Sequence, residues 1–471
     1  MSRSRLMVVA LGATLALVLA ACSGGSSSKS GGSSGGGSAL PPCAVGALAK
    51  VTATAPVSIT FWHAMNRANE EALQRLLDQY QAQQPKVKVK LINQTGYRES
   101  FEKYKAGLNT GDLPDVVQIE DTGTQQMIDT QSVIPMASCI KADRYNTSDF
   151  LRRTIDYYSV KGTLWPMPFN VSNPVLYYDK NAFSKAGLDP NRSPLTLDEV
   201  KQYSEKLKGG GYEFGYGLKL DPWYIEQLSA KAGVPFVNNG NGRTARATKV
   251  AFDNPTGLEI FTWMKDLVDQ KLAVTNGADG PSAFDNLLGI RSKKNAMTVD
   301  SSAALGTISQ VMASGDGGGV SLGVGPMPGP KGSGGVLVGG AALYVPKASS
   351  PEKQAAAWDL IKFLVSSKSQ SEWAAATGYV PLRKSAARTA AIQKLWADSP
   401  GYKVAYDQLV GGVENTATAG PVVGPYQEVR DIVLAAEQRM FTENLTPKAA
   451  LARAAKEANR ALADYNARVG G

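Results

Sequence analysis

Alternating strand and helix patterns between residues 57 and 119 restrict this chain to a small group of folds. Hydrophobic and polar residues alternate over Val57–Phe61, as in a half-buried strand. Apolar residues at helical spacing follow over 72–80, then alternation over 87–91, a helical pattern over 98–109 and a strand pattern over 115–119. This order of strand, helix, strand, helix and strand predicts a parallel sheet whose strands are joined by crossover helices.

The ends of these strands are the first place to look for a binding site. In open parallel sheets, ligands bind beyond the carboxyl ends of the strands. Tyr97 follows the second predicted strand, and Glu120 and Asp121 follow the third. We therefore expect a site at these two loops.

The rest of the chain continues the mixture of strands and helices. We expect a strand at Pro174–Tyr178 and helices at Leu197–Leu207, from Pro351 and from Pro447. Residues 314–340 are rich in Gly and Pro, but Lys331 is followed by Gly332 rather than by Ser or Thr, so no phosphate-binding loop can be placed there. We interpret that stretch as a loop or hinge.

The first 21 residues have the features of a secretory signal peptide. Arg3 and Arg5 precede an apolar run over 6–19 that is too short to span a bilayer comfortably. The run leads into Leu-Ala-Ala-Cys, which resembles the lipobox of bacterial lipoproteins, so Cys22 is the expected lipidation site. A plain signal peptide with an incidental Cys is the alternative. Residues 22–45 contain a Gly/Ser tract, which we expect to act as a flexible tether to the outer face of the cytoplasmic membrane.

Two cysteines remain in the body of the chain if Cys22 is lipidated. They are Cys43 and Cys139. An oxidising compartment outside the cytoplasm favours a disulfide between them, whereas two separate free thiols are the alternative.

Composition argues against several function classes. Lys and Arg number 50 against 41 Asp and Glu, giving a net charge of +9 over 471 residues with no long basic run, so nucleic-acid binding has little support. One His, His63, and three Cys leave few ligands for a zinc or iron site. We expect neither a metal nor a cofactor.

Several stretches together resemble one known family. They are Phe61–His63, Asn170–Tyr178 continuing into Ala182–Pro190, Gly339–Leu343, Thr377–Pro381 and Gly424–Arg430. These stretches resemble the family 1 extracellular solute-binding proteins of ABC importers, and within them the glycerol-3-phosphate-binding branch. The resemblance runs from about Val57 to Tyr465.

The resemblance implies an α/β fold with two lobes, of the periplasmic-binding-protein type and similar to maltose-binding protein (class II). The chain would cross between the lobes three times and bind its ligand in the cleft. The expected boundaries place 46–169 and 299–343 in lobe I, and 170–298 and 344–471 in lobe II.

The resemblance also assigns roles to individual residues. Tyr97 and Asp121, where many relatives have Glu, would hold the glycerol end of a ligand. The phosphate would be held by Ser172, Ser301, the backbone N–H of Gly340, Tyr379 and Arg430. Hydroxyls and a backbone donor suit phosphate oxygens, and Arg supplies a planar charged fork that matches them. Each of these residues alone could equally serve a turn or a surface hydrogen bond.

One position departs from the glycerol-3-phosphate pattern. Leu197 stands where those relatives carry Trp, so we expect a roomier cleft. A phosphodiester with a head group would fit, as in the actinobacterial members that take glycerophosphodiesters such as glycerophosphocholine. A choline cation prefers aromatic faces, and Trp223 and Tyr224 are candidates for it, with ordinary packing as the alternative.

The leading hypothesis is therefore a monomeric, lipid-anchored binding protein that captures a glycerophosphodiester or glycerol-3-phosphate and presents it to a membrane permease. A maltose-like oligosaccharide is the alternative ligand within the same fold. A secreted hydrolase is less well supported, because the sequence gives no reason to pair Glu120 or Asp121 with a second acid and the metal ligands of a phosphodiesterase are scarce. A purely structural surface lipoprotein would not explain the phosphate-suited residues.

Overall fold

The computed structural model describes residues 40–278, 282–314 and 319–470. The predicted signal peptide, Cys22 and the Gly/Ser tract lie outside these residues. The predicted tether, 22–45, extends too far along the chain. Cys43 is buried and joined by a disulfide to Cys139, with 4.9 Å between their Cα atoms. The folded body therefore includes at least Cys43.

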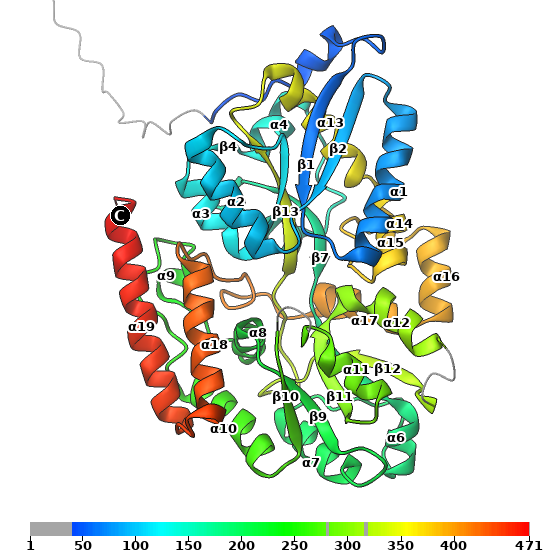
Figure 1. Ribbon diagram of the computed structural model, residues 1–471, viewed down its shortest axis with the longest axis vertical. Coiled ribbons are helices and arrows are strands. Elements are labelled where there is room, and N and C mark those ends of the chain that lie inside the picture. The colour runs from blue at the N-terminus through cyan, green and yellow to red at the C-terminus, as the bar shows by residue number, and fades with distance from the viewer. Residues whose placement is uncertain (1–39, 279–281, 315–318, 471) are drawn as a thin grey trace, which may run out of the picture. The chain divides into compact units, whose positions relative to one another are not determined.

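Strands of the described residues form two main sheets, one in each of two α/β lobes (Figure 1). The first has the order β2-β1-β3-β13-β4, with β7 also paired to β13. Its strands are β1 (Val57–His63), β2 (Val87–Asn93), β3 (Val116–Glu120), β4 (Val133–Ile134), β7 (Met167–Ser172) and β13 (Gly339–Pro346). β1 pairs in parallel with β2 and β3, as the alternation over 57–119 predicts.

The second sheet has the order β10-β9-β11-β8-β12. Its strands are β8 (Pro174–Asp179), β9 (Phe214–Lys219), β10 (Ala273–Asn276), β11 (Asn295–Ser301) and β12 (Leu322–Pro326). β9 pairs in parallel with β10 and β11, whereas β8 runs antiparallel to β11 and β12. A separate two-stranded sheet joins β5 (Ser159–Val160) to β6 (Thr163–Leu164).

Helices cover both sheets. Those of lobe I are α1 (Arg67–Gln83), α2 (Tyr97–Thr110), α3 (Thr124–Asp129), α4 (Met136–Asp143), α5 (Arg152–Tyr157), α13 (Pro351–Leu364), α14 (Ser367–Thr377), α15 (Lys384–Ala387) and α16 (Ala390–Asp398). Lobe II and its border contain α6 (Lys180–Lys185), α7 (Leu197–Leu207), α8 (Pro222–Ala232), α9 (Asn238–Asn241), α10 (Pro255–Asp269), α11 (Asp285–Arg291), α12 (Leu305–Ala313), α17 (Gly401–Gly411), α18 (Tyr426–Thr442) and α19 (Pro447–Arg468).

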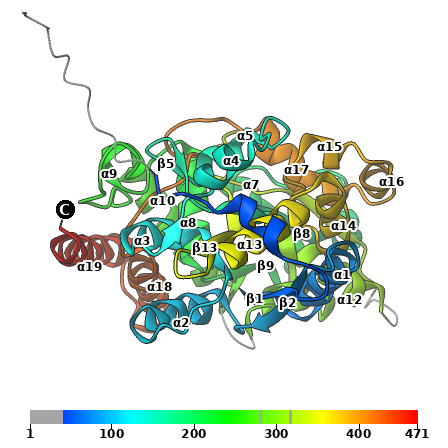
Figure 2. The ribbon, with the colours of Figure 1, turned by 90° about the horizontal axis from the view of Figure 1, so that it is seen from above.

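Several helices begin where the sequence predicts. The side chains of Thr196, Ser350 and Thr446 each accept a backbone N–H in the first turn of α7, α13 and α19, which satisfies donors that the helix itself cannot. Pro351 and Pro447 occupy the first helical turn, where a missing N–H has no cost. α13 packs on β1 and β13, and the short 3-10 helix η1 (Val45–Lys50) lies beside it (Figure 2).

The chain crosses between the two sheets three times, between β7 and β8, between β12 and β13, and between α16 and α17. The fold class is thus as predicted, but the lobe boundaries differ. β11 and β12 pair with strands of the second sheet, so 299–326 belong to lobe II. β7 pairs with β13, and α13 to α16 pack on the first sheet or on its helices, so 170–172 and 351–398 belong to lobe I. The Gly- and Pro-rich stretch likewise contains β12, and the part after β12 forms the second crossover.

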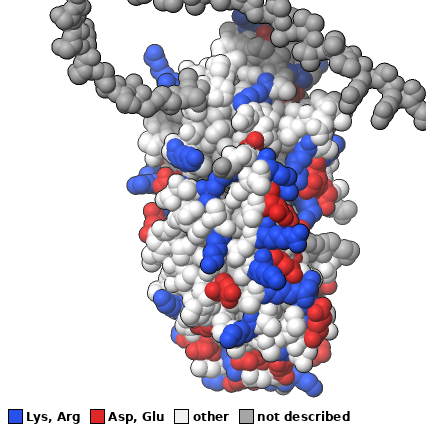
Figure 3. Space-filling model, turned by 90° about the vertical axis from the view of Figure 1, so that its left-hand side faces the viewer, with Lys and Arg blue, Asp and Glu red and all other residues white. Residues whose placement is uncertain are grey.

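Charged side chains of both signs are mixed on the face that carries α19 (Figure 3). No helix within the described ranges is both long enough and apolar enough to cross a membrane.

Candidate functional site

A pocket of about 230 Å³ lies where the two lobes meet. Lobe I contributes Tyr97, Glu120, Asp121, Ser172, Gly340 and Tyr379, and lobe II contributes Lys219, Asp221, Trp223, Tyr224, Asp300, Ser301 and Arg430, with Ala303 beside them. We call this the cleft pocket. All seven residues assigned to ligand binding from the sequence line it, together with both aromatic head-group candidates.

Tyr97 and Tyr379 form a neutral part of the lobe I wall. Asn170 donates from Nδ2 to the Tyr97 hydroxyl at 2.8 Å, and the two tyrosine hydroxyls are 3.5 Å apart. Gly378, in the left-handed conformation, ends α14 and turns the chain so that the Tyr379 ring stacks on Trp373 at a centroid distance of 5.4 Å. The Thr-Gly-Tyr sequence thus positions a rigid phenol at the cleft.

Asp121 begins the 3-10 helix η2 (Asp121–Gly123), at the carboxyl end of β3. Tyr157 donates its hydroxyl to Asp121 Oδ2 at 2.5 Å. Burial raises the pKa of Asp121 to about 7, Arg430 opposes that shift, and Glu120 adds to it. Asp121 can therefore change its protonation near neutral pH, accepting hydrogen bonds when ionised and donating one when protonated.

Two glycines allow the chain to approach closely at the start of β13. Gly340 has a φ of 98°, and a Cβ there would lie 2.0 Å from the Asn170 carbonyl oxygen. A Cβ on Gly339 would lie 2.4 Å from the Trp223 ring. Gly340 therefore allows β13 to approach β7 within the first sheet, and Gly339 allows β13 to approach α8 across the cleft.

Arg430, on α18, is already paired within the protein. Its Nε and Nη2 donate to the two carboxylate oxygens of Glu226 at 2.7 and 2.6 Å, and Nη1 donates to Glu120 at 3.2 Å. Two of the five guanidinium N–H donors remain for a ligand. The sequence predicted a cation available to phosphate, but the structure shows one whose charge Glu226 and Glu120 largely offset.

Lys219 and Asp300 form a second buried ion pair on the lobe II wall. Their charged atoms are 3.0 Å apart. Asn286 also donates to Asp300 at 2.9 Å, and the backbone N–H of Ser301 donates to it at 2.7 Å. The Ser301 hydroxyl accepts from the Ala303 N–H at 3.2 Å and keeps its own proton for a ligand. These contacts hold the end of β11 at the cleft.

Leu197 does not line the cleft pocket. Its carbonyl accepts a hydrogen bond from Trp263 Nε1 at 2.9 Å, and its side chain lines a separate cavity of about 20 Å³ behind Lys219 and Tyr224. The sequence predicted extra room in the cleft at this position, whereas the space around Leu197 is largely filled by neighbouring side chains such as Trp263 and Met264.

Sequence reasoning missed four charged residues of the site. Lys219 is the last residue of β9, Asp221 follows that strand, and Asp300 is near the end of β11, so the strand-end rule would have found them once the second sheet was known. Glu226 lies on α8 and gave no signal, because only the fold brings it to Arg430. Among the described residues, no group of three or more His, Cys, Asp or Glu could hold a metal.

A larger hollow of about 500 Å³ adjoins the cleft pocket and shares Tyr97, Glu120, Asp221 and Arg430 with it. Arg98 on α2 and Asp431 on α18 form an ion pair at this hollow, with Nη1 and Oδ2 3.0 Å apart. Because α2 belongs to lobe I and α18 to lobe II, this pair bridges the mouth of the cleft.

Known proteins with similar sequences and folds bind solutes. The chain is 28% identical over 431 residues to the sn-glycerol-3-phosphate-binding periplasmic protein UgpB of Escherichia coli strain K12, covering 89% of this chain and 95% of the relative. The structure resembles UgpB from Mycobacterium tuberculosis in complex with glycerophosphocholine, with a TM-score of 0.73, 21% identity and coverage of 87% and 98% of the two chains.

A sugar-binding protein of the same fold is nearly as similar. It is the GacH receptor of Streptomyces glaucescens, solved unliganded and with acarbose, with a TM-score of 0.72, 22% identity and coverage of 87% of this chain and 99% of the receptor. The sequence profile of the bacterial extracellular solute-binding proteins matches residues 75–400. The chain therefore belongs to that family, the substrate-binding components of ABC importers.

Proposed function

We propose that this protein captures a zwitterionic glycerophosphodiester, with glycerophosphocholine as the leading ligand, in the cleft pocket and delivers it to an ABC permease. The observation that carries the proposal is that hydroxyls, a backbone amide and an arginine suited to phosphate face acids suited to glycerol hydroxyls within one pocket. Contacts from both lobes would let the ligand favour the closed form.

The charge of the pocket favours a diester with a cationic head group over glycerol-3-phosphate. Its acids are Glu120, Asp121, Asp221 and Asp300, whereas its cations are only Lys219 and Arg430. A phosphate monoester brings close to two negative charges into this acidic surrounding, whereas glycerophosphocholine brings one negative and one positive charge. Trp223 and Tyr224 offer aromatic faces to the choline cation, with ring centroids 5.5 Å apart.

An oligosaccharide is the second candidate, and the make-up of the pocket favours it in one respect. Tyr97, Trp223, Tyr224 and Tyr379 supply aromatic rings beside the four acids, and sugar sites commonly combine rings with carboxylates. The adjoining hollow of about 500 Å³ would lengthen the site for a chain of sugars.

Calorimetric titration with glycerophosphocholine, glycerol-3-phosphate, phosphocholine and maltose separates these ligands. We expect glycerophosphocholine to bind at least about tenfold more tightly than the other three, a difference of about 1.4 kcal/mol or more. Phosphocholine tests the glycerol end, because it lacks the hydroxyls assigned to Tyr97 and Asp121. Tight maltose binding would replace the proposal with the sugar alternative, and equal binding of phosphocholine would remove the glycerol assignment.

We also propose that the protein works as a monomer outside the cytoplasm, anchored through a lipid on Cys22. The lipobox-like sequence supports this proposal. Expression of the full chain and of Cys22→Ala in a bacterial host, followed by membrane fractionation, tests it. We expect the wild type in the membrane fraction and the variant outside it, and equal distribution would contradict the anchor.

A further inference from the structure

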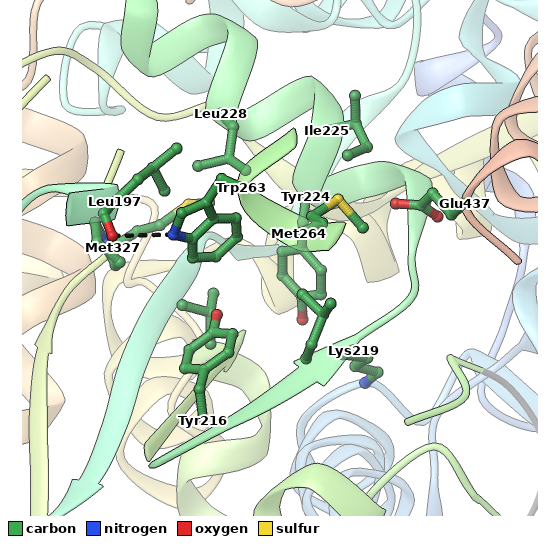
Figure 4. A pocket seen from close by; sticks show the side chains of 13 residues that line it. Leu197, Tyr216, Lys219, Tyr224, Ile225, Leu228, Trp263, Met264, Met327 and Glu437 are labelled. Carbon is green, nitrogen blue, oxygen red and sulfur yellow. Dashed lines mark hydrogen bonds between the residues drawn. The ribbon is translucent and has the colours of Figure 1, made fainter. Parts of the chain in front are cut away.

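A second, smaller cavity, next to the cleft pocket, lies among side chains of lobe II, which Figure 4 shows. Lys219 and Tyr224 line both pockets, so the two spaces meet at these residues. Tyr216 and Trp263 line its inner side, with ring centroids 5.8 Å apart in an edge-on arrangement. We call this space the inner pocket. Its lining is apolar and aromatic except for Lys219 and one acid, Glu437.

Glu437 has no hydrogen-bond partner for either carboxyl oxygen within the described part of the chain. Its side chain extends from α18 into the inner pocket and points toward Met264 (Figure 4). The residue is only 1% exposed, so bulk water cannot satisfy it. A buried carboxyl group without partners is costly to the fold, and such groups are rare unless something binds them.

The charged groups that act most strongly on Glu437 are acids. Burial raises the pKa of Glu437 well above its usual range, and the nearby acids Asp221 and Glu226 raise it further. Lys219 is the cation that lines the inner pocket, and Asp300, 3.0 Å away, already offsets it. Glu437 is therefore protonated in the ligand-free protein, and a positively charged ligand group placed beside it would favour its ionised form.

The volume of the inner pocket limits what that group can be. About 20 Å³ holds about one water molecule, since a water needs about 10–15 Å³ measured in this way. A primary ammonium group is close to water in size and donates three hydrogen bonds. A trimethylammonium group is much larger and has no N–H to donate, so a choline head group would have to stay in the cleft pocket.

We propose that the inner pocket is a subsite for the primary ammonium of a ligand head group, with the Glu437 carboxylate as its acceptor. This subsite rests on the proposed function, because the rest of the ligand would occupy the cleft pocket. It extends the ligand range to diesters with an aminoethyl head group, of which glycerophosphoethanolamine is the simplest. Choline and aminoethyl diesters would then share the phosphate and glycerol contacts and differ only at the head group.

Titration of wild type and Glu437→Gln with glycerophosphoethanolamine and glycerophosphocholine tests the subsite. We expect the variant to lose about tenfold or more in affinity for the amine, because a charge-assisted hydrogen bond to a carboxylate is lost, and to bind the choline diester within about twofold of wild type. Glu428→Gln is the matched control, since it makes the same substitution at an exposed position on α18 and should change neither affinity.

The outcomes separate the subsite from the proposed function. If neither diester binds the wild type, the proposed function fails and the subsite with it. If both bind and Glu437→Gln weakens both equally or neither, the function stands and the subsite is wrong, with the inner pocket holding only water. Circular dichroism and thermal unfolding of each variant check that it is folded, and retained binding of the choline diester shows that its cleft is intact.

Discussion

Two parts of the cleft pocket, the charged wall of lobe II (Lys219 and Arg430) and the tyrosine wall of lobe I (Tyr97 and Tyr379), satisfy their polar groups in different ways. On lobe II, Lys219 is paired with Asp300, and Arg430 is held by Glu226 through two hydrogen bonds. On lobe I, Tyr97 and Tyr379 are neutral and share one long hydroxyl contact of 3.5 Å. The charged wall is therefore part of the structure as well as of the site, whereas the tyrosine wall can be altered with less effect on the fold.

Arg430→Ala should give the largest effect, on stability and binding together. It would leave Glu226, which is 2% exposed, buried without its cation, and breaking a buried ion pair in this way costs about 3–5 kcal/mol. Denaturant unfolding should show that loss, and calorimetry should show that diester binding is lost as well. The sequence assigned Arg430 to phosphate binding alone, so its pairing with Glu226 adds a loss of stability to the expected binding defect.

A double variant separates the two effects. Arg430→Met combined with Glu226→Gln removes both charges and should recover much of the stability but none of the binding. If Arg430→Ala unfolds at the same denaturant concentration as wild type, the charged wall is not structural and the contrast between the walls is lost.

Asp121 should make the ligand-free protein less stable as the pH rises. Its pKa is about 7 in the folded protein and about 3.9 in an unfolded chain, so between these values the folded state holds a proton that the unfolded state lacks. The free energy of unfolding is thus highest below about pH 4 for this group and falls as the pH rises through 7, by at most about 1.4 kcal/mol per pH unit.

Asp121→Asn tests this prediction, because it removes the titrating group and keeps a similar shape. Unfolding measured from about pH 5 to about pH 8.5 should show a smaller decline in the variant than in wild type. A residual decline is expected, since burial also raises the pKa of Glu437 and of Asp221. An identical slope in the two proteins would show that Asp121 titrates normally.

Much of the fold could be predicted, because the local patterns agree with the structure. The alternation over 57–119 and the caps at Thr196, Ser350 and Thr446 depend only on neighbouring residues. The lobe boundaries were harder, since β12 is short and lies within a Gly- and Pro-rich stretch. Its place beside β8 is decided by pairing across about 150 residues of sequence, which no local pattern reveals.

The site also contains residues that the sequence predicts and residues that only the fold reveals. Tyr97 and Asp121 follow predicted strands, and family motifs led to Ser172, Tyr379 and Arg430, all of which line one pocket. The partners of these residues could not be predicted. Glu226 is 204 positions from Arg430, and the acid that faces the inner pocket, Glu437, lies on a helix whose apolar neighbours give no sign of a cavity. Charge compensation is a property of the packed fold.

Tyr379→Phe should affect binding with little effect on stability, in contrast to Arg430→Ala. The ring would still stack on Trp373, and the lost hydroxyl makes a long contact to Tyr97 and a further hydrogen bond with Asn170, which itself remains bonded to Tyr97. Removal of one ligand hydrogen bond should weaken diester affinity by about 0.5–1.5 kcal/mol, or about two- to tenfold. Tyr158→Phe is the control, because its buried hydroxyl has no partner among the described residues and does not line the cleft pocket. A fall in stability as large as that of Arg430→Ala would show that the Tyr379 hydroxyl is needed for the fold, and not only for binding.

Arg98→Ala should give the smallest change in diester affinity. The Arg98–Asp431 pair joins the two lobes at the rim of the cleft, and both side chains are about half exposed (49%). Exposed ion pairs contribute about 0.2–1 kcal/mol, and salt screens them. If the pair helps to hold the lobes closed, its loss should weaken diester binding by less than about fivefold at low salt, and the difference from wild type should shrink at high salt. Asp431→Asn should give the same pattern, since either substitution removes the same contact. A loss of diester affinity of tenfold or more that persists at high salt would mean that Arg98 contacts the ligand. Arg98 would then belong to the binding site, as Lys219 and Arg430 do.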